Sequence, residues 1–420
     1  MSRHNAQQTT KPSPADIALG YGLGTAVPMA AFGKAVMAPF LILALALAAW
    51  RVWADRSKRQ DQDDWLKCLY QPAVWVFAFW LISSLQSLDP VKSMETWVRT
   101  AGLVGVGVLF AAALDLRGQA RLSLTRSIIA TTLFSSVLVS VLLLLQSAGM
   151  IDATVLVFGT PLDPAQRFKS FGAVAVCLIP LCLWFGWQLG GRWKVAALLC
   201  VPAVAVVLAG AGRQPSLDGL LGGIGGLTLL VIVAGLIHLP KVARRLLGIF
   251  CVAGATVLFF WICLNLPSVP VNADQTGALP LLDWHRQVIW GFAVDAFTQN
   301  WLFGVGPNAI DLMPGARDII PGMHQEYIPG HPHNWLFEVM AETGVLGTAA
   351  IGIALLFLVA EFARRAANGV SGAWAAIFLC GAFWTSALAN FSIWAAWWQA
   401  CFIVLISIAF VLTRTDGTSR

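Results

Sequence analysis

The residues best suited to chemistry lie close together between positions 330 and 347, in the stretch GHPHNWLFEVMAETGVLG. His331 and His333 flank a proline, and Asn334 is a residue type that commonly caps the start of a helix. A helix that begins at Asn334 places His333 beside its positive end, where the dipole disfavours the charged imidazolium. A neutral imidazole can accept a proton near pH 7, and free N–H groups at a helix start favour an anion. The stretch therefore predicts a base beside an anion-binding pocket.

Two other interpretations of these histidines stay open. Both could be polar residues that only cap a helix at a membrane surface. They could also bind zinc, because His285 and His324 belong to the same region and a His-x-His pair can join a zinc site. The proline between the pair and the lack of a His-x-x-x-His helix argue against zinc, so we expect no metal site.

The composition of the chain places this stretch in a membrane protein. Hydrophobic residues make up 58% of the 420 residues, charged residues only 11%, and the mean hydropathy is +0.74. Apolar stretches near the ~20 residues that cross a bilayer predict twelve spans in an all-helical protein. They cover residues 15–33, 35–53, 72–88, 97–114, 127–148, 170–189, 193–211, 217–238, 246–265, 334–360, 371–388 and 391–413. Glycines and Pro28 weaken the first span, which we interpret as a retained helix rather than a signal peptide.

The lysines and arginines predict the orientation of these spans. With the N-terminus in the cytoplasm, 19 of the 27 basic residues fall in inside segments and 8 in outside segments. Each inside turn carries at least two, so the positive-inside rule supports twelve spans with both termini cytoplasmic. The basic pI therefore reflects topology. We expect the lipid bilayer, and no nucleic acid, as a partner.

One outside segment, residues 266–333, is much longer than the other connections and is expected to carry function. The chain thus divides into spans 1–9 (residues 1–265), this large periplasmic loop with short helices, and spans 10–12 (residues 334–420). Within the loop, residues 283–301 have the spacing of an amphipathic helix. We expect it to lie along the outer membrane surface with Trp284, Trp290 and Trp301 at the headgroups.

Ionisable residues are nearly missing from the centres of the predicted spans, which argues against an ion-coupled carrier. The candidate site is therefore expected at the outer face of the membrane. No ATP is present there, so a reaction at this face must be driven by an activated substrate. A base beside an anion-binding pocket suits group transfer from a lipid-linked phosphate donor.

The stretch also resembles the signature of the O-antigen ligase family, in the pattern His333, Asn334, nine residues, Gly344, two residues, Gly347. Further matches are Arg213 in LAGAGRQPSLDGLLGG, and Arg286 and Trp290 followed by LFGVG. The chain departs from the family at Gly212, where Ser or Thr is usual, and over residues 167–180, which lack the usual asparagines. We therefore assign no role to Arg167.

The resemblance implies a glycosyltransferase in lipopolysaccharide biosynthesis at the periplasmic face of the bacterial inner membrane. It would move a glycan from undecaprenyl pyrophosphate to lipid A–core, with inversion and without cofactor, metal or ATP. His333 would be the general base, and Arg213 and Arg286 would bind the diphosphate. His331 and Asn334 are further candidates for substrate binding, and either could instead be a helix cap. Either arginine could instead anchor its helix at the headgroups or pair with a neighbouring acid.

The helix that follows the histidines carries two acidic residues and two glycines. Glu338 and Glu342 lie on one face of the helix that follows the motif; they could orient an imidazole, although we favour bonds to neighbouring helices. Gly344 and Gly347 are expected to permit close packing.

Three rival functions use similar features. An O-antigen polymerase shares the lipid donor, but polymerases tend to have a glycine eleven residues after an outside arginine. None of the outside arginines of this chain has one: the residues at that offset are Phe110, Leu178, Ile224, Phe297 and Ile328. An O-linked protein oligosaccharyltransferase shares the motif, but is commonly longer, with a soluble domain after the last span. A flippase for lipid-linked glycans, from a different functional class, is expected to have a charged central cavity, which bare span centres do not favour.

Overall fold

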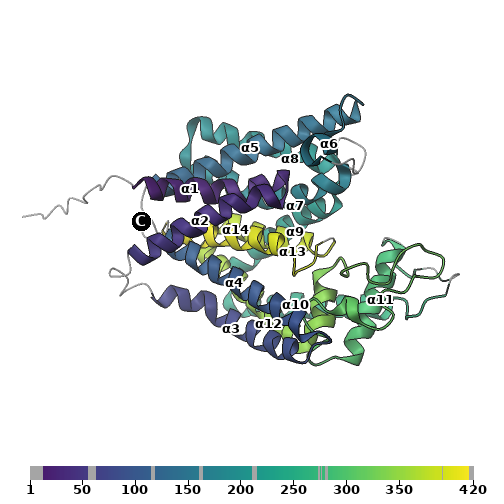
Figure 1. The fold of residues 1–420 in the computed structure, drawn as a ribbon. Coiled ribbons are helices and arrows are strands. Elements are labelled where there is room, and N and C mark those ends of the chain that lie inside the picture. Colours follow the sequence, from purple (N-terminus) through teal and green to yellow (C-terminus); the bar gives the residue numbers. More distant parts are fainter. Residues whose placement is uncertain are drawn as a thin grey trace, which may run out of the picture.

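The computed structural model describes residues 13–54, 63–114, 119–159, 164–210, 215–272, 275, 277–279, 282–389 and 391–415. Over these residues the chain is all-helical, with one isolated β-bridge between Ile319 and Glu326 (Figure 1). The helices are α1 (Pro14–Ala26), η1 (Pro28–Phe32), α2 (Lys34–Ala54), α3 (Asp63–Leu85), α4 (Pro90–Leu114), α5 (Gln119–Ser147), α6 (Ala153–Phe158), α7 (Pro164–Leu189), α8 (Gly191–Ala209), α9 (Leu217–Ile237), α10 (Lys241–Leu264), α11 (Trp284–Gln299), η4 (Ile310–Leu312), α12 (Trp335–Ala367), α13 (Gly372–Ser386) and α14 (Ala396–Thr415).

Nine helices in the described residues are long and apolar enough to cross a membrane: α2, α4, α5, α7, α8, α9, α10, α12 and α14. The protein is therefore a multi-pass membrane protein. Each of the twelve expected spans contains a helix, but three of these helices are shorter. The apolar parts of α3 (Pro72–Leu85) and α13 (Gly372–Ser386) have 10–17 residues, and α1 has 13.

Glycines in α1 explain how so short a helix packs into the bundle. A Cβ at Gly20 would overlap the carbonyl oxygen of Ala120, and one at Gly24 would overlap the hydroxyl of Ser127. The helix can therefore lie directly against α5. Ser127 and Thr131 of α5 then donate hydrogen bonds to the carbonyl oxygens of Gly20 and Gly24, at 3.3 and 3.2 Å.

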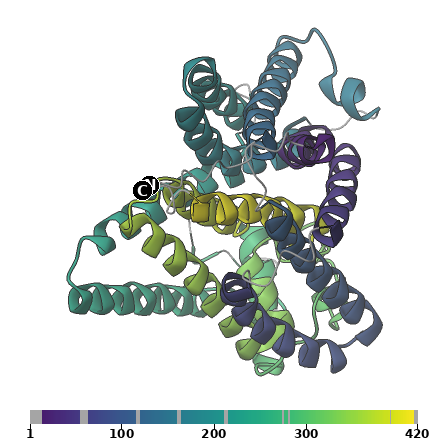
Figure 2. The same ribbon diagram turned by 90° about the vertical axis from the view of Figure 1, so that its left-hand side faces the viewer.

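The bundle is arranged around α14. Seen from the end opposite α11, α14 lies between a group that contains α1, α5 and α8 and a group that contains α3 and α12 (Figure 2). The C-terminal end of α14 and the region around α11 lie at opposite ends of the bundle (Figure 1).

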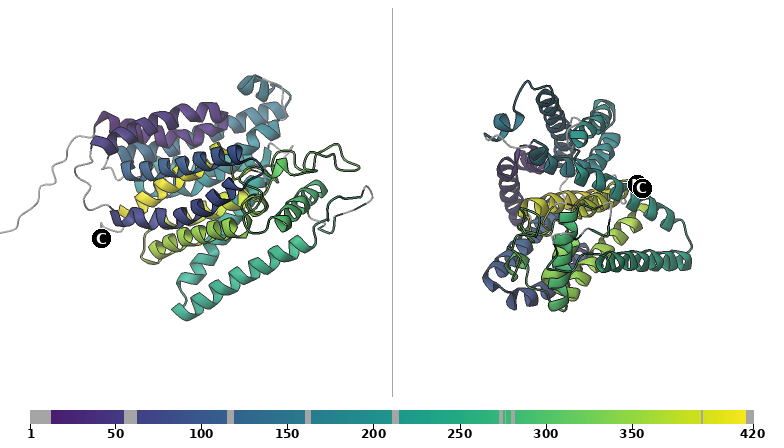
Figure 3. Two further views of the ribbon diagram at one scale, coloured as in Figure 1. Left: turned by 60° about the horizontal axis from the view of Figure 1, so that its bottom comes forward. Right: turned by 90° about the vertical axis from the view of Figure 1, so that its right-hand side faces the viewer.

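The helix α10 stands apart from the bundle. It lies at the edge of the molecule (Figure 3), and none of its residues, all of which the structure describes, is buried. Its exposed side chains are mostly apolar, including Leu246, Phe250 and Leu258. Near its C-terminal end α10 packs on the cap and on α12, where the rings of Phe259 and Phe337 have centroids 5.4 Å apart. The rest of its exposed apolar surface is suited to a lipid environment.

The segment between α10 and α12 has a hydrophobic core of its own. Val288, Ile289 and Phe292 of α11 are buried together with Ile320 and Ile328 from the later part of the segment. Phe337, Met340 and Ala341 of α12 complete this cluster. The segment is thus a folded cap whose core continues into the first turns of α12.

This packing corrects the expected position of Trp290. The expectation of a headgroup-level side chain is wrong, because Trp290 is only 7% exposed and stacks on Phe337 with ring centroids 5.1 Å apart. Trp301 is exposed, and Trp284 is partly buried against the core of the cap. The expectation that α11 lies along the membrane surface with one face covered is also wrong, because every residue from 287 to 293 is buried and the helix runs through the core of the cap.

Candidate functional site

The candidate site is built around the start of α12. Asn334 is the N-cap residue, and its side-chain oxygen accepts hydrogen bonds from the backbone N–H groups of Leu336 (3.0 Å) and Phe337 (3.4 Å). Its buried side chain therefore satisfies donors that the helix itself leaves unpaired. This geometry fits the capping alternative for Asn334, because the side-chain oxygen is engaged by the backbone.

The two histidines directly precede this cap and touch each other. Their ring centroids are 4.2 Å apart, and Nδ1 of His331 accepts a hydrogen bond from the backbone N–H of His333 at 3.0 Å. His333 has a positive φ of 55°, a left-handed conformation that is uncommon for residues other than glycine. A sparsely populated conformation at a candidate base is an observation that favours a functional role.

His331 is held as a neutral ring. Burial is the largest cause that lowers its pKa, to about 3, and the positive charges that His333 and Arg286 can carry add to the effect. Because Nδ1 accepts a hydrogen bond, the proton of the neutral ring is on Nε2. His331 is thus suited to hold His333 in place and to donate a hydrogen bond. Accepting a proton near neutral pH is unfavourable for this ring.

Arg286 approaches the histidines from the first turn of α11. Its backbone N–H bonds the carboxylate of the N-cap residue Asp283 at 3.3 Å, and its guanidinium donates to the carbonyl oxygen of Ala389, beyond α13. Burial lowers the pKa of Arg286, whereas Asp283 and Asp218 act in the opposite direction. A guanidinium stays charged despite such a shift, so Arg286 places a half-buried cation beside the neutral His331.

Trp290, one turn after Arg286, fixes α11 to the histidine segment. Its indole N–H donates to the carbonyl oxygen of Pro332, which lies between the two histidines, at 3.0 Å. The stacking of its ring on Phe337 attaches the same helix to the first turn of α12. These two contacts of Trp290 fix the position of α11, and so of Arg286, relative to the histidine pair.

The two glutamates of α12 bind neighbouring segments, which agrees with the favoured interpretation. Glu338 accepts from the hydroxyl of Ser392 (2.6 Å) and the backbone N–H of Ile393 (2.8 Å). Glu342 accepts from the backbone N–H groups of Asn308 (2.7 Å) and Ile310 (3.1 Å), and from the indole of Trp394. Both carboxylates are almost completely buried. They tie the 391–395 connection and the cap to the helix that begins at the site.

Gly344 and Gly304 allow the cap to lie against α12. Gly344 has φ 64° and interrupts the helix, and a Cβ there would overlap the backbone carbonyl of Leu302. Gly304 also has a positive φ, and a Cβ on it would overlap the backbone of Glu342. Cap and helix exchange backbone hydrogen bonds at this break, from Val345 to Trp301 (2.8 Å) and from Gly306 to Glu342 (2.9 Å). Gly344 and Gly304 therefore join α12 to the cap, whereas a Cβ at Gly347 would approach Trp80 of α3.

The structure brings four of the expected site residues together: Arg286, His331, His333 and Asn334. Arg213 lies outside the described residues, and so does the side chain of Arg167.

One residue that the sequence analysis did not select also belongs here. Asp218, in the first turn of α9, is fully buried, accepts from the hydroxyl of Ser216 at 2.8 Å, and interacts electrostatically with Arg286. The sequence feature that could have indicated Asp218 is its position as a lone acidic residue in the first turn of a predicted span.

The described residues do not gather into a metal site. No group of three or more His, Cys, Asp or Glu side chains is close enough there to hold a metal ion. His285, one of the four histidines considered for zinc, instead contacts the carbonyl oxygen of Glu326, at 3.4 Å.

Comparison with known proteins identifies the region that contains this site. Residues 217–352 match the family model described as O-antigen ligase (Wzy_C), an interval from the start of α9 to the middle of α12. It includes Arg286, His331, His333, Asn334 and both motif glycines, while Arg213 lies just before it. The chain is also similar to a Rickettsia conorii protein named "Putative polysaccharide ligase". The two are 22% identical over 376 residues, which cover 87% of this chain and 85% of that protein.

Proposed function

We propose that this chain, which carries an O-antigen ligase domain over residues 217–352, transfers a glycan from undecaprenyl pyrophosphate to lipid A–core. The family supports a polysaccharide-transferring membrane enzyme that acts on lipid-linked glycans. The observation that carries the finer proposal is the meeting of His331, His333 and Arg286 at the start of α12. It combines a candidate base, a neutral ring that holds it, and a cation suited to a phosphate.

His333 acts as the general base in the proposed reaction. It takes the proton of an acceptor sugar hydroxyl while the hydroxyl oxygen attacks the anomeric carbon of the donor glycan. The bond between that carbon and the phosphate oxygen breaks, and undecaprenyl pyrophosphate leaves with the electron pair. Attack on the face opposite the leaving group inverts the anomeric centre. The glycosyl pyrophosphate is already activated, so the reaction requires no nucleotide.

Arg286 stabilises the charge that develops on the leaving pyrophosphate. A guanidinium remains charged when half-buried, and its planar N–H groups match phosphate oxygens. One of its nitrogens bonds Ala389, which orients the group. Arg213 is proposed as the second cation on the diphosphate, from its sequence match alone. The proton on Nε2 of His331 is a further donor for substrate oxygens.

The proposal includes a twelve-span topology in the bacterial inner membrane. Both termini are cytoplasmic, and the cap between α10 and α12 faces the periplasm, where both lipid substrates expose their glycans. The distribution of basic residues supports this orientation. The position of the C-terminal helix end opposite the cap agrees with it (Figure 1).

The experiment that tests the proposal is a transfer assay with purified protein in liposomes. The protein receives undecaprenyl-pyrophosphate-linked glycan and lipid A–core, with EDTA and without nucleotide, and products are separated by gel electrophoresis. Wild type is expected to move glycan to lipid A–core. His333→Asn is expected to lose activity by about 10²-fold or more, because asparagine tolerates the left-handed backbone but cannot act as the base.

The matched control is His324→Asn, which makes the same change at an exposed histidine of the cap. It is expected to retain wild-type activity. Elongation of the donor on itself would identify a polymerase, and transfer only to an added protein acceptor would identify an oligosaccharyltransferase. Wild-type activity in His333→Asn would refute the assignment of the base.

A further inference from the structure

Three cations and two tryptophans gather where α7 turns into α8, beside the second turn of α5. The guanidinium of Arg126 in α5 lies 5.7 Å from the ring centroid of Trp193, and the guanidinium of Arg192 lies 5.6 Å from the same centroid. The ammonium of Lys194 lies 3.8 Å from the ring centroid of Trp187. All three distances are in the range of cation–π contacts. These five residues are called the basic–indole cluster.

The basic–indole cluster lies at the end of the bundle opposite the cap. Arg121, in the first turn of α5, donates to the carbonyl oxygen of Leu412 in the last turn of α14, at 3.5 Å. That end of α14 lies opposite the region around α11 (Figure 1). Trp187 is 63% exposed. An exposed indole beside cations at a helix end is typical of the interface between hydrocarbon and head groups, so the cluster lies at one surface of the membrane.

The three cations of the cluster are not neutralised by acidic side chains. Among the described residues they make cation–π contacts but no hydrogen bond or ion pair from the side chain. At the same end of the bundle, by contrast, Arg364 and Arg365 both pair with Glu361. Like charges that share one indole ring repel each other unless an anion lies between them. The cluster is therefore suited to an anion from outside the chain.

The nitrogens that such an anion would contact are accessible. Arg192 is exposed, and Arg126 is half-buried. Of the nitrogens of Arg126, only Nε is shielded from the surface without a hydrogen bond, so the two terminal nitrogens stay open to a ligand. A guanidinium presents these terminal N–H groups to phosphate oxygens, which makes phosphate the best-matched anion.

An exposed apolar strip continues from the cluster along α8. Val195 and Leu199 are each more than half exposed, and Pro202 is exposed as well. Their spacing of three and four residues places them on the same face of the helix as Arg192. A phosphate held at Arg192 can therefore carry hydrocarbon chains that lie along this strip. A soluble phosphate compound would leave the strip uncovered, so the arrangement favours a lipid.

We propose that the basic–indole cluster binds the head group of an anionic glycerophospholipid. Its phosphate lies between Arg126 and Arg192, and its acyl chains lie along the exposed face of α8. A zwitterionic phospholipid also has a phosphate, but its ammonium group would meet Arg192 and Lys194 with like charge. The bound lipid links α5 to the turn between α7 and α8. This site is separate from the histidine pair and does not depend on the proposed function.

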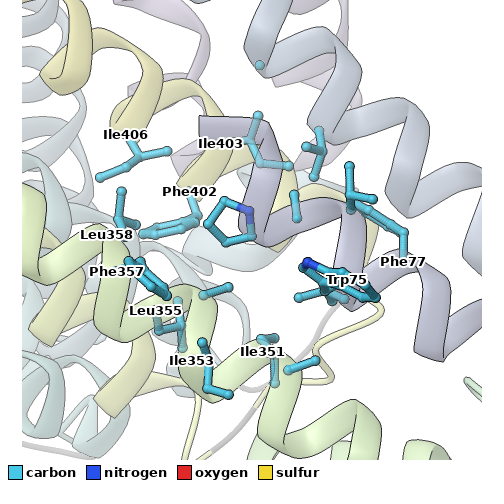
Figure 4. Close-up of a pocket in the computed structure, with 18 of the residues that line it drawn as sticks. Trp75, Phe77, Ile351, Ile353, Leu355, Phe357, Leu358, Phe402, Ile403 and Ile406 are labelled. Carbon is cyan, nitrogen blue, oxygen red and sulfur yellow. The ribbon is translucent and has the colours of Figure 1, made fainter. Parts of the chain in front are cut away.

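A second place for hydrocarbon belongs to other helices of the bundle. A cavity of about 1220 Å³ is lined mainly by α3, α4, α12, α13 and α14, none of which carries a residue of the basic–indole cluster. The labelled side chains around it, such as Trp75, Ile351 and Phe402, are all aliphatic or aromatic (Figure 4). Hydrocarbon can fill such a cavity without selection of a head group. Its occupancy is therefore expected to be equal for different phospholipids and in every variant of the cluster.

The test measures phospholipid binding to the purified full-length protein by native mass spectrometry. The probes are phosphatidylglycerol and phosphatidylethanolamine with the same acyl chains, and soluble glycerol phosphate as a competitor. Wild type is expected to retain phosphatidylglycerol at least about fivefold more tightly than phosphatidylethanolamine. Arg126→Gln and Arg192→Gln each remove one cation, so each is expected to weaken phosphatidylglycerol binding about fivefold. The double variant is expected to lose the preference.

The matched control is Arg245→Gln, the same change at an exposed arginine in the second turn of α10. The other end of α10 packs on the cap, so Arg245 also lies at the end of the bundle away from the cap. No cation–π contact involves this residue. Arg245→Gln is expected to bind both phospholipids as wild type does.

Three results would overturn the proposal. They are equal retention of both phospholipids by wild type, equal losses in Arg245→Gln and Arg126→Gln, and unchanged phosphatidylglycerol binding in the double variant. Displacement of phosphatidylglycerol by an equal concentration of glycerol phosphate would show a site for a soluble anion and refute the lipid assignment.

Thermal unfolding separates lost binding from lost folding. Without lipid, the variants of the basic–indole cluster are expected to unfold close to wild type. Added phosphatidylglycerol should raise the midpoint of wild type and of His333→Asn, but not that of the double variant, because a ligand stabilises only a protein that binds it. A rise of the same size in the double variant would contradict the assigned site.

Discussion

At the scale of single residues, the His331 ring accepts a hydrogen bond in its neutral form, and its burial in the folded protein disfavours protonation. Its pKa in the folded protein is about 3, below the ordinary value of 6.5. Between these values the unfolded chain binds a proton that the folded protein does not, so stability falls as the pH is lowered from about 6.5 toward 3. The expected loss is on the order of 1 kcal/mol per pH unit in this window.

The variant His331→Asn tests this linkage. An asparagine oxygen can accept the bond from the N–H of His333 in the same way, but it does not titrate. We expect its thermal unfolding midpoint in detergent to decline less between pH 6.5 and 5 than that of wild type. His324→Asn, at an exposed position, should follow the wild-type curve. Parallel curves for wild type and His331→Asn would show that His331 does not carry the effect.

At the scale of elements, the break in α12 joins the membrane helix to the cap. Gly344→Ala is expected to destabilise the protein by more than about 2 kcal/mol, because alanine disfavours φ 64° and its Cβ would overlap Leu302. Gly352→Ala is the matched control in the same helix, where an added Cβ has nothing within 4 Å. It should be neutral or stabilising by up to about 1 kcal/mol. Similar midpoints for the two variants in thermal unfolding would contradict this role of the break.

The sequence predicted best those elements that depend only on residues next to each other in the chain. Long apolar stretches placed a helix in every expected span, because length and hydropathy depend only on neighbouring residues. The break at Gly344 and the partners of Glu342 were not predictable, since they involve residues 302 and 308–310, more than 30 positions away. Trp290 was misplaced for the same reason, because its partners Pro332 and Phe337 belong to a different helix start.

The candidate site was predicted in part. A motif identified His331, His333 and Asn334 from one short stretch, and the resemblance added Arg286. Asp218 was missed because an acid at the start of an apolar helix becomes informative only once α11 brings Arg286 near it. The structural roles of Asn334 and His331 also required coordinates, because an N-cap and a ring acceptor are defined by hydrogen bonds.

At the scale of the whole molecule, the reaction requires the cap to face the periplasm. Orientation can be tested with single added cysteines and a membrane-impermeant maleimide on intact spheroplasts. Gln325→Cys, exposed in the cap, should be labelled directly, whereas Asn368→Cys, exposed in the turn between α12 and α13, should be labelled only after the membrane is permeabilised.

The native chain provides the background control for this labelling. Five of its seven described cysteines are buried, and Cys251 and Cys263 lie in the apolar helix α10, where a charged reagent has little access. The described cysteines should therefore label weakly, and Cys68, whose side chain lies outside the described residues, is replaced by serine in the background protein. Labelling of Asn368→Cys from outside, with Gln325→Cys protected, would place the histidine pair in the cytoplasm. Undecaprenyl-pyrophosphate-linked glycans exposed at the periplasmic face could not reach it there, so that one result would exclude the proposed reaction whatever the geometry of the site.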